Sequence, residues 1–180
     1  MSVLSAQSIR RLCNPPVPLW MIDPSARERP YQRHVQAAIH PLITPFTERG
    51  VVNGKSYGLS GCSYDVRIAE DLTLEPGQTA LVSTIEAFHF PDNVCASVVD
   101  KSTYARKFVS AFNTHFDAGF CGHATIELAN LGQETVVYQR GDPVCQFKFE
   151  WLDEPTEKPY RGKYQNQPAR PVAAISEESA

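Results

Sequence analysis

The sequence has no apolar run long enough to cross a membrane. A membrane-spanning helix needs roughly 18 consecutive apolar residues, and every apolar stretch of this 180-residue chain is far shorter. The start, "MSVLSAQSIRRL", also has no charged segment followed by the apolar core of a secretion signal. We therefore expect a cytoplasmic protein without a membrane partner.

An excess of positive charge is lacking as well. The net charge is -3, and no run of Lys or Arg dominates a face. Binding to nucleic acid draws its affinity from many contacts between basic side chains and phosphates, so we expect no nucleic-acid partner. A small anionic ligand needs only a few local cations and is not excluded.

The chain has no CxxC pair, and its five histidines form no HxE or HExxH motif. The signature of zinc-dependent base deaminases is therefore absent, and we expect no metal held by protein side chains. The cysteines are odd in number and widely spaced, which indicates reduced, mostly packed thiols: Cys13, Cys62, Cys95, Cys121 and Cys145. The motif GxGxxG and the Walker loop are absent too, which excludes the usual nucleotide-binding folds.

What is present is the pattern of an all-β domain. From Tyr57 onward, short alternating or β-branched runs such as "SYDVRIA", "ATIELAN" and "PVCQFKFEWL" are separated by turn residues at a spacing near ten residues. This texture is typical of a sandwich or barrel. Its length and a hydrophobic fraction of 42% favour a single domain.

The two ends of the chain differ from this β-rich part. Ser5 is a plausible N-cap for a short amphipathic helix with Ile9 and Leu12 on one face. Residues 14–45 carry seven prolines, which predicts an extended insertion or arm with one possible short helix near "YQRHVQAAIH". We expect a single domain over residues 1–170 and a flexible tail over 171–180.

One stretch, "DKSTYARKFVSAFNTHFDAGFCGHATIELAN", concentrates polar residues within this β-pattern. In its last strand, Glu127 points to the face opposite Ile126 and Leu128. On pattern alone this position is a surface carboxylate; if the face lines a cleft, Glu127 becomes a candidate general base with Arg106 as its counter-charge. Asp117 is either a turn residue that caps its own backbone or part of the same cleft.

Together these motifs resemble the dCTP deaminase family, a branch of the trimeric dUTPase superfamily. The resemblance rests on "KSTYAR" (101–106), "DAGFCG" (117–122) and "TIEL" (125–128) with Asn130. Four further segments agree in order: "LSAQSIRRL" near the start, "GCSYDVRIA", "GDPVCQFKF" and "PYRGKYQNQ".

The resemblance implies a dUTPase-like fold, a distorted jelly roll or β-clip barrel, in a homotrimer whose active sites lie between subunits and are closed by the C-terminal tail. It implies zinc-independent deamination of dCTP in deoxynucleotide metabolism, with Glu127, Ser102 and Arg106 as catalytic residues. Mg²⁺ would arrive on the triphosphate. Ten residues would contact substrate: Lys101, Thr103, Asn113, Thr114, Asp117, Gln146, Tyr160, Lys163, Gln165 and Gln167.

Three departures from the family pattern keep other functions open. Asp100 replaces a usual glycine, Lys101 replaces an arginine, and Asn113 or Thr114 stands where bacterial members have a small alanine. The first alternative is a diphosphohydrolase of dUTP or dCTP, or a bifunctional deaminase giving dUMP, in which Asp117 activates water. The second is a nucleotide-sensing or scaffold protein that has lost the chemistry.

Overall fold

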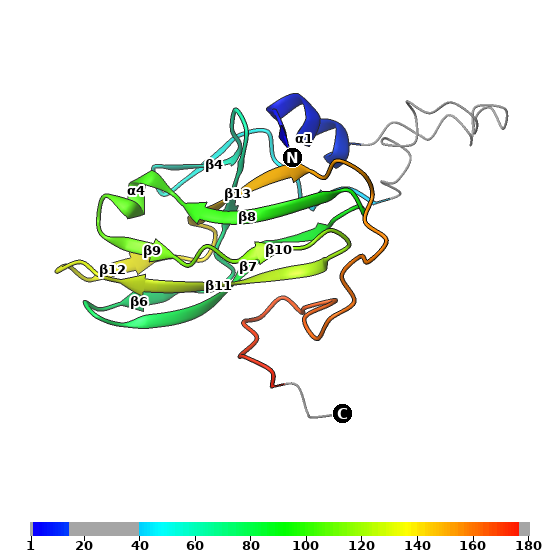
Figure 1. The fold of residues 1–180 in the computed structure, drawn as a ribbon. Coiled ribbons are helices and arrows are strands. Elements are labelled where there is room, and N and C mark those ends of the chain that lie inside the picture. Colours follow the sequence, from blue (N-terminus) through cyan, green and yellow to red (C-terminus); the bar gives the residue numbers. More distant parts are fainter. Residues whose placement is uncertain (1, 15–39, 177–180) are drawn as a thin grey trace, which may run out of the picture.

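The computed structural model describes residues 2–14 and 40–176, which form facing β-sheets with a helix at the N-terminal end (Figure 1). In chain order the elements are β1 (Ser2–Val3), α1 (Ala6–Cys13), β2 (Ile43–Thr44), β3 (Gly50–Val52), β4 (Lys55–Leu59), β5 (Tyr64–Arg67), β6 (Leu72–Leu74), β7 (Thr79–His89), β8 (Val94–Asp100), α4 (Ser102–Ala105), β9 (Val109–Ala111), β10 (His115–Phe116), β11 (Cys121–Asn130), β12 (Val136–Tyr138) and β13 (Pro143–Trp151).

Two sheets carry most of the strands. The seven-stranded sheet has the order β10-β8-β13-β5-β4-β3, with β1 paired to β13, and the four-stranded sheet has the order β2-β7-β11-β9. β12 and β6 form a separate pair. The prediction of an all-β domain is therefore confirmed.

Aromatic side chains hold the two sheets together. Phe88 of β7 stacks on Phe147 of β13 with ring centroids 4.4 Å apart, and the buried Phe90 and Phe149 pack against this pair. Aromatic pairs at such separations add to the large area that each ring buries. This core fixes the position of β11, which lies next to β7.

A buried ion pair also links the sheets. The Arg67 Nε of β5 lies 2.7 Å from the Glu86 Oε1 of β7, and the Arg67 backbone N–H donates to the other carboxylate oxygen. Burial raises the pKa of Glu86, while the donors of Arg67 oppose that rise. Such a pair adds directional contacts to an otherwise apolar contact between the sheets.

The predicted N-terminal helix is confirmed as α1. Ser5 occupies its N-cap position, although the Ser5 side chain makes no capping hydrogen bond. Ile9 and Leu12 are buried as the spacing predicts, and Arg10 Nη2 donates to Glu48 across the surface at 2.8 Å. α1 is thereby fixed to the sheet beside β4. Neither described helix is long and apolar enough to cross a membrane.

The predicted proline-rich arm falls mostly on residues 15–39, outside the described residues, as does most of the possible short helix near "YQRHVQAAIH". Its last part joins the fold: Leu42 and Ile43 are buried, and β2 pairs with β7.

Residues 171–176 of the predicted flexible tail are hydrogen-bonded to the rest of the chain. The Val172 N–H donates to Thr125 Oγ1 at 3.1 Å, and the Ile175 N–H donates to the Tyr164 hydroxyl at 3.0 Å. The composition of this segment predicts disorder because it has no apolar period, but backbone donors can dock on polar side chains without one.

Candidate functional site

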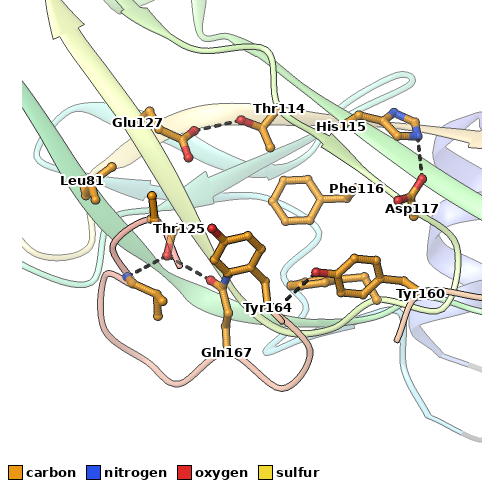
Figure 2. Close-up of a pocket in the computed structure, with 13 residues that line it drawn as sticks. Leu81, Thr114, His115, Phe116, Asp117, Thr125, Glu127, Tyr160, Tyr164 and Gln167 are labelled. Atoms are coloured by element: carbon orange, nitrogen blue, oxygen red, sulfur yellow. Dashed lines mark hydrogen bonds and ion pairs between the residues drawn. The ribbon is translucent and has the colours of Figure 1, made fainter. Parts of the chain in front are cut away.

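A cavity of about 410 Å³ opens where β10, β11 and the C-terminal tail meet (Figure 2). Its volume lies in the range of small-molecule sites. The lining residues are Leu81, Thr114, His115, Phe116, Asp117, Phe120, Thr125, Glu127, Tyr160, Tyr164, Gln167, Val172 and Ala174. Five of them are predicted site residues: Thr114, Asp117, Tyr160, Gln167 and Glu127.

Strand β11 places Glu127 in this cavity. Alternation along the strand puts Thr125 and Glu127 on the same face, while Ile126 is fully buried on the other. The Thr114 hydroxyl donates to Glu127 Oε2 over 2.9 Å, and Figure 2 shows the two side chains pointing toward each other. Glu127 is half-buried in the cavity wall, so the interpretation as an ordinary surface carboxylate does not hold.

Another part of the cavity carries a second carboxylate. His115 Nε2 lies 3.6 Å from Asp117 Oδ1, and His115 Nδ1 lies 3.4 Å from the hydroxyl of Ser97. Both His115 and Asp117 are more than half exposed. Figure 2 shows this pair separated from Glu127 by the ring of Phe116. The cavity therefore has two acidic ends with an apolar middle.

Aromatic rings line that middle. Phe120 and Tyr160 have centroids 6.0 Å apart, and Phe116 packs edge-on to Phe120 at 5.0 Å. The Tyr160 hydroxyl accepts the Tyr164 N–H at 3.1 Å, which fixes the second tyrosine. Flat rings of this kind are suited to contact the face of a heterocyclic base.

The tail docks beside β11 through its glutamines. Gln165 accepts the Cys121 N–H and donates to the Gly119 carbonyl, both at 2.9 Å. Gln167 accepts the Thr125 hydroxyl at 2.9 Å, and its carbonyl accepts the His123 N–H at 3.0 Å. The tail segment from Tyr160 to Gln167 is thus hydrogen-bonded to its own chain next to Glu127.

The two glycines of "DAGFCG" make this close approach possible. Gly119 has φ +87° and Gly122 has φ +125°, and a Cβ on either would fall 2.7 Å or less from Pro159 or Gln167. Only glycine combines these backbone angles with that space. The segment that approaches these glycines is the C-terminal tail.

Three predicted catalytic or binding residues lie away from the cavity. Ser102 and Thr103 are exposed on α4, and Arg106 directly follows it. Arg106 lines a different hollow of about 500 Å³ together with Phe108 and Leu131. The two hollows share no lining residue, so the described part of one chain does not bring Arg106 into the cavity with Glu127 as its counter-charge.

Lys101 and Gln146 meet at Asp65. Lys101 Nζ donates to Asp65 Oδ2 and Gln146 Nε2 donates to Asp65 Oδ1, each at 2.7 Å. Lys101 is 7% exposed. Both predicted substrate contacts are therefore held in one buried cluster of the free chain, while Asn113 and Lys163 are exposed.

The unusual Asp100 has a local function in the chain. Its Oδ1 accepts the Ala111 N–H at 2.7 Å, and the Ser110 hydroxyl lies 3.2 Å from the same oxygen. The carboxylate thus joins the end of β8 to the end of β9. A glycine could not make this bond.

A thiol and two imidazole rings lie close together at Cys121, whose N–H contacts the tail. Cys121 Sγ is 3.3 Å from His89 Nδ1, and the ring of His40 lies 4.4 Å from that of His89. Burial, with a smaller effect of His40, lowers the pKa of His89. All five cysteines lie in the described part of the chain and are free, as expected. Within residues 2–14 and 40–176, no group of three or more acidic, His or Cys side chains is arranged to hold a metal ion.

Several lining residues escaped the sequence analysis. Thr125 carried a usable signal, since period-two alternation puts it on the face of Glu127. Leu81 faces Glu127 only through the β7–β11 register, and Val172 and Ala174 arrive with the tail. No local sequence pattern predicts the position of these residues in the cavity.

Comparison with known proteins identifies relatives along most of the chain. A family model described as dCTP deaminase-like matches residues 61–152. The dCTP deaminase of Campylobacter curvus is 33% identical over 166 residues, covering 74% of this chain and 88% of its own. The dCTP deaminase of Thermococcus gammatolerans is 32% identical over 131 residues, covering 69% and 83%.

Two solved structures share the fold. The native dUTPase of EIAV aligns with a TM-score of 0.50 at 16% identity over 66% of this chain and 94% of its own. The dUTPase from phage phi11 of S. aureus aligns with a TM-score of 0.50 at 19% identity over 67% and 95%. The predicted dUTPase-like fold is thereby confirmed, and on the family model and the sequence relatives together, this chain belongs to the dCTP deaminase-like family.

Proposed function

We propose that the chain is a dCTP deaminase that converts dCTP to dUTP by attack of water at C4 of the cytosine, without zinc. The single observation that carries the proposal is the half-buried Glu127 carboxylate in an aromatic-lined cavity, in a chain whose relatives are named dCTP deaminases. A carboxylate in such a place is suited to move protons to and from a bound base.

In the proposed reaction, Glu127 takes a proton from water as the water oxygen bonds to C4 of the cytosine. The tetrahedral intermediate, with the electron pair of the former N3=C4 bond on N3, then receives that proton on the exocyclic nitrogen. The C4–N bond to this nitrogen breaks, ammonia leaves as the carbonyl forms, and the hydroxyl proton ends on N3. The faces of Phe116, Phe120 and Tyr160 would hold the base. Positioned proton transfer of this kind is worth roughly 10²- to 10⁴-fold in rate.

The site would be completed by a second copy of the chain in a homotrimer. Within the described residues the Arg106 guanidinium has no ion-pair partner, and Ser102 is exposed beside it. Exposed apolar side chains flank this surface, with Phe108 69% and Leu131 72% accessible. We propose that Ser102 and Arg106 of one subunit reach Glu127 of the next, where Arg106 pairs with the carboxylate and Ser102 orients water.

The triphosphate, with Mg²⁺ bound to it, would lie toward the tail and α4. Thr103 and Lys163 are exposed and would contact the phosphates, and Asp117 would contact the sugar. Gln165, Gln167 and Tyr160 would keep the tail closed over the base. Lys101, Asn113 and Gln146 stay predicted contacts; Asp65 is the present partner of Lys101 and Gln146.

The test is to incubate the purified protein with dCTP and Mg²⁺ and to separate the nucleotide products. We expect dUTP, or dUMP if hydrolysis follows, with release of ammonia. Glu127→Gln keeps the size of the side chain and should lower kcat by about 10²-fold or more. Glu154→Gln, an exposed carboxylate outside the cavity, is the control. Absence of any deaminated product from the folded wild type would disprove the proposal.

A second candidate function is diphosphohydrolysis, favoured by Asp117 in the same cavity beside His115. Asp117 would activate water for attack on the α-phosphorus of dUTP or dCTP. Pyrophosphate release that survives Glu127→Gln but not Asp117→Asn would support this function alone. If pyrophosphate release is lost only in Asp117→Asn and deamination is lost only in Glu127→Gln, the enzyme is bifunctional.

A further inference from the structure

The direction of the hydrogen bond between Thr114 and Glu127 is fixed by chemistry. An ionised carboxylate can only accept, so the 2.9 Å contact to Glu127 Oε2 uses the hydroxyl proton of Thr114. The backbone of Thr114 is held as well: its N–H donates to the Phe112 carbonyl at 2.8 Å and its carbonyl accepts the Val98 N–H at 3.0 Å. The hydroxyl therefore starts from a fixed place beside the carboxylate.

This hydrogen bond determines which polar groups the two side chains can offer to a ligand. With its proton given to Glu127, Thr114 Oγ1 has only lone pairs left, and so does the Glu127 carboxylate. Both residues line the cavity. Within one chain, Thr114 and Glu127 thus present neighbouring acceptors, which match a ligand group that carries hydrogens.

The two pyrimidines differ at the atom that such a pair distinguishes. The exocyclic amino group of cytosine donates, whereas the C4 oxygen of uracil only accepts. An oxygen placed against two acceptors leaves polar groups unpaired, which costs affinity on the order of 10-fold. An amino group in the same place loses nothing.

We propose that Thr114 is the specificity-determining residue of this site: it positions Glu127 and makes the cavity select a pyrimidine nucleotide with an exocyclic amino group over one with an oxo group. This inference rests on the proposed function, because it takes the C4 edge of the base to lie at Glu127. Thr114 acts through Glu127 during the chemistry and directly on the ligand during binding.

The experiment compares Thr114→Val, which keeps the shape and loses the hydroxyl, with Thr114→Ser, which keeps the hydroxyl. Thr73→Val, exposed on β6 and outside the lining of the cavity, is the matched control. We would measure kcat and KM for dCTP and, by calorimetry, the Kd of α,β-imido-dUTP, a uracil nucleotide that resists hydrolysis between the α- and β-phosphates.

Thr114→Val should lower kcat for dCTP about 10-fold with a smaller change in KM, because Glu127 loses its orienting donor. The same variant should bind the uracil analogue several-fold more tightly, because an opposing acceptor is gone. Thr114→Ser should restore both values, and Thr73→Val should change neither.

The outcomes separate this inference from the proposed function. A wild type that forms no deaminated product would refute the deaminase, yet the calorimetry would still test Thr114. Uracil-analogue affinity that is unchanged or weaker in Thr114→Val would overturn the inference, even with deamination intact. A Thr114→Ser variant that behaves like Thr114→Val would overturn it as well.

Discussion

Asp142 connects the β3–β4 hairpin to the turn before β13. Its carboxylate accepts hydrogen bonds from Lys55 Nζ at 2.5 Å, Asn53 Nδ2 at 2.9 Å and the Gln139 N–H at 3.0 Å. Burial would raise the pKa of Asp142, but these donors outweigh burial and lower it. A lowered pKa in the folded state means that the ionised carboxylate stabilises the fold.

We expect Asp142→Asn to lower the free energy of unfolding by about 1–3 kcal/mol near neutral pH, because Lys55 loses its charged partner. The stabilisation by Asp142 is complete above its unfolded pKa of about 3.9 and is lost as the pH falls through the lower folded value. The difference between wild type and variant should therefore shrink below about pH 4.

Urea unfolding between neutral and acidic pH measures this difference. Asp153→Asn, an exposed aspartate, should change little at any pH. A difference in the free energy of unfolding between wild type and Asp142→Asn that stays constant down to the lowest pH measured would show that the charge of Asp142 does not stabilise the turn.

Individual residues of the site were predictable to different degrees. Alternation alone gave the face of Glu127, and the motifs around it indicated the cavity. The partner of Glu127 was not predictable, because Thr114 reaches it across the fold from 13 positions earlier. Lys101 was expected at the substrate, yet it pairs with Asp65, 36 positions away, and no local pattern contains that contact.

At the scale of elements, the tail is the segment on which closure of the cavity depends. We expect Gly122→Ala to undock it, because the new Cβ would lie 2.4 Å from the Gln167 nitrogen at a φ that other residues rarely adopt. The KM for dCTP should rise several-fold, and trypsin should cleave faster at the exposed Arg161 and Lys163.

The variant Gly54→Ala is a control that separates the effect of backbone strain from the effect of displacing the tail. Gly54 also has a positive φ, +73°, but nothing lies within 4 Å of the added Cβ. This control should cost stability without changing KM or cleavage of the tail. Equal KM and equal protection of the tail in Gly122→Ala and wild type would contradict the assigned role of Gly122.

The long strands were predictable because their alternation is strong. β5 and β13 fall within the runs "SYDVRIA" and "PVCQFKFEWL", and "ATIELAN" covers most of β11. The β3–β4 hairpin was missed, although Asn53 and Gly54, both at positive φ, form the Asn-Gly turn that favours hairpins. β10, with two residues, owes its pairing to β8 and has no pattern of its own.

At the scale of the whole molecule, the proposed site between subunits allows a complementation test. Neither Glu127→Gln nor Arg106→Ala trimers should deaminate dCTP at a normal rate. If the chains are mixed, unfolded and refolded together, about one site in four should combine an intact Glu127 with an intact Arg106 from its neighbour. Because about one site in four is intact, we expect about a quarter of wild-type activity to return.

Analytical ultracentrifugation of both variants is the control for assembly, since each must still form trimers. No recovery of activity in mixed trimers would mean that Arg106 does not act on the Glu127 of another subunit.

The docked tail has one more consequence, for the edge of a sheet. β9 borders β11 only along Leu128–Asn130; further along, the tail takes up the free N–H groups of Cys121 and His123. An uncovered strand edge is a template for pairing with another chain. We therefore expect the docked tail also to protect this strand edge from pairing with another chain, and self-association to increase when the tail is undocked.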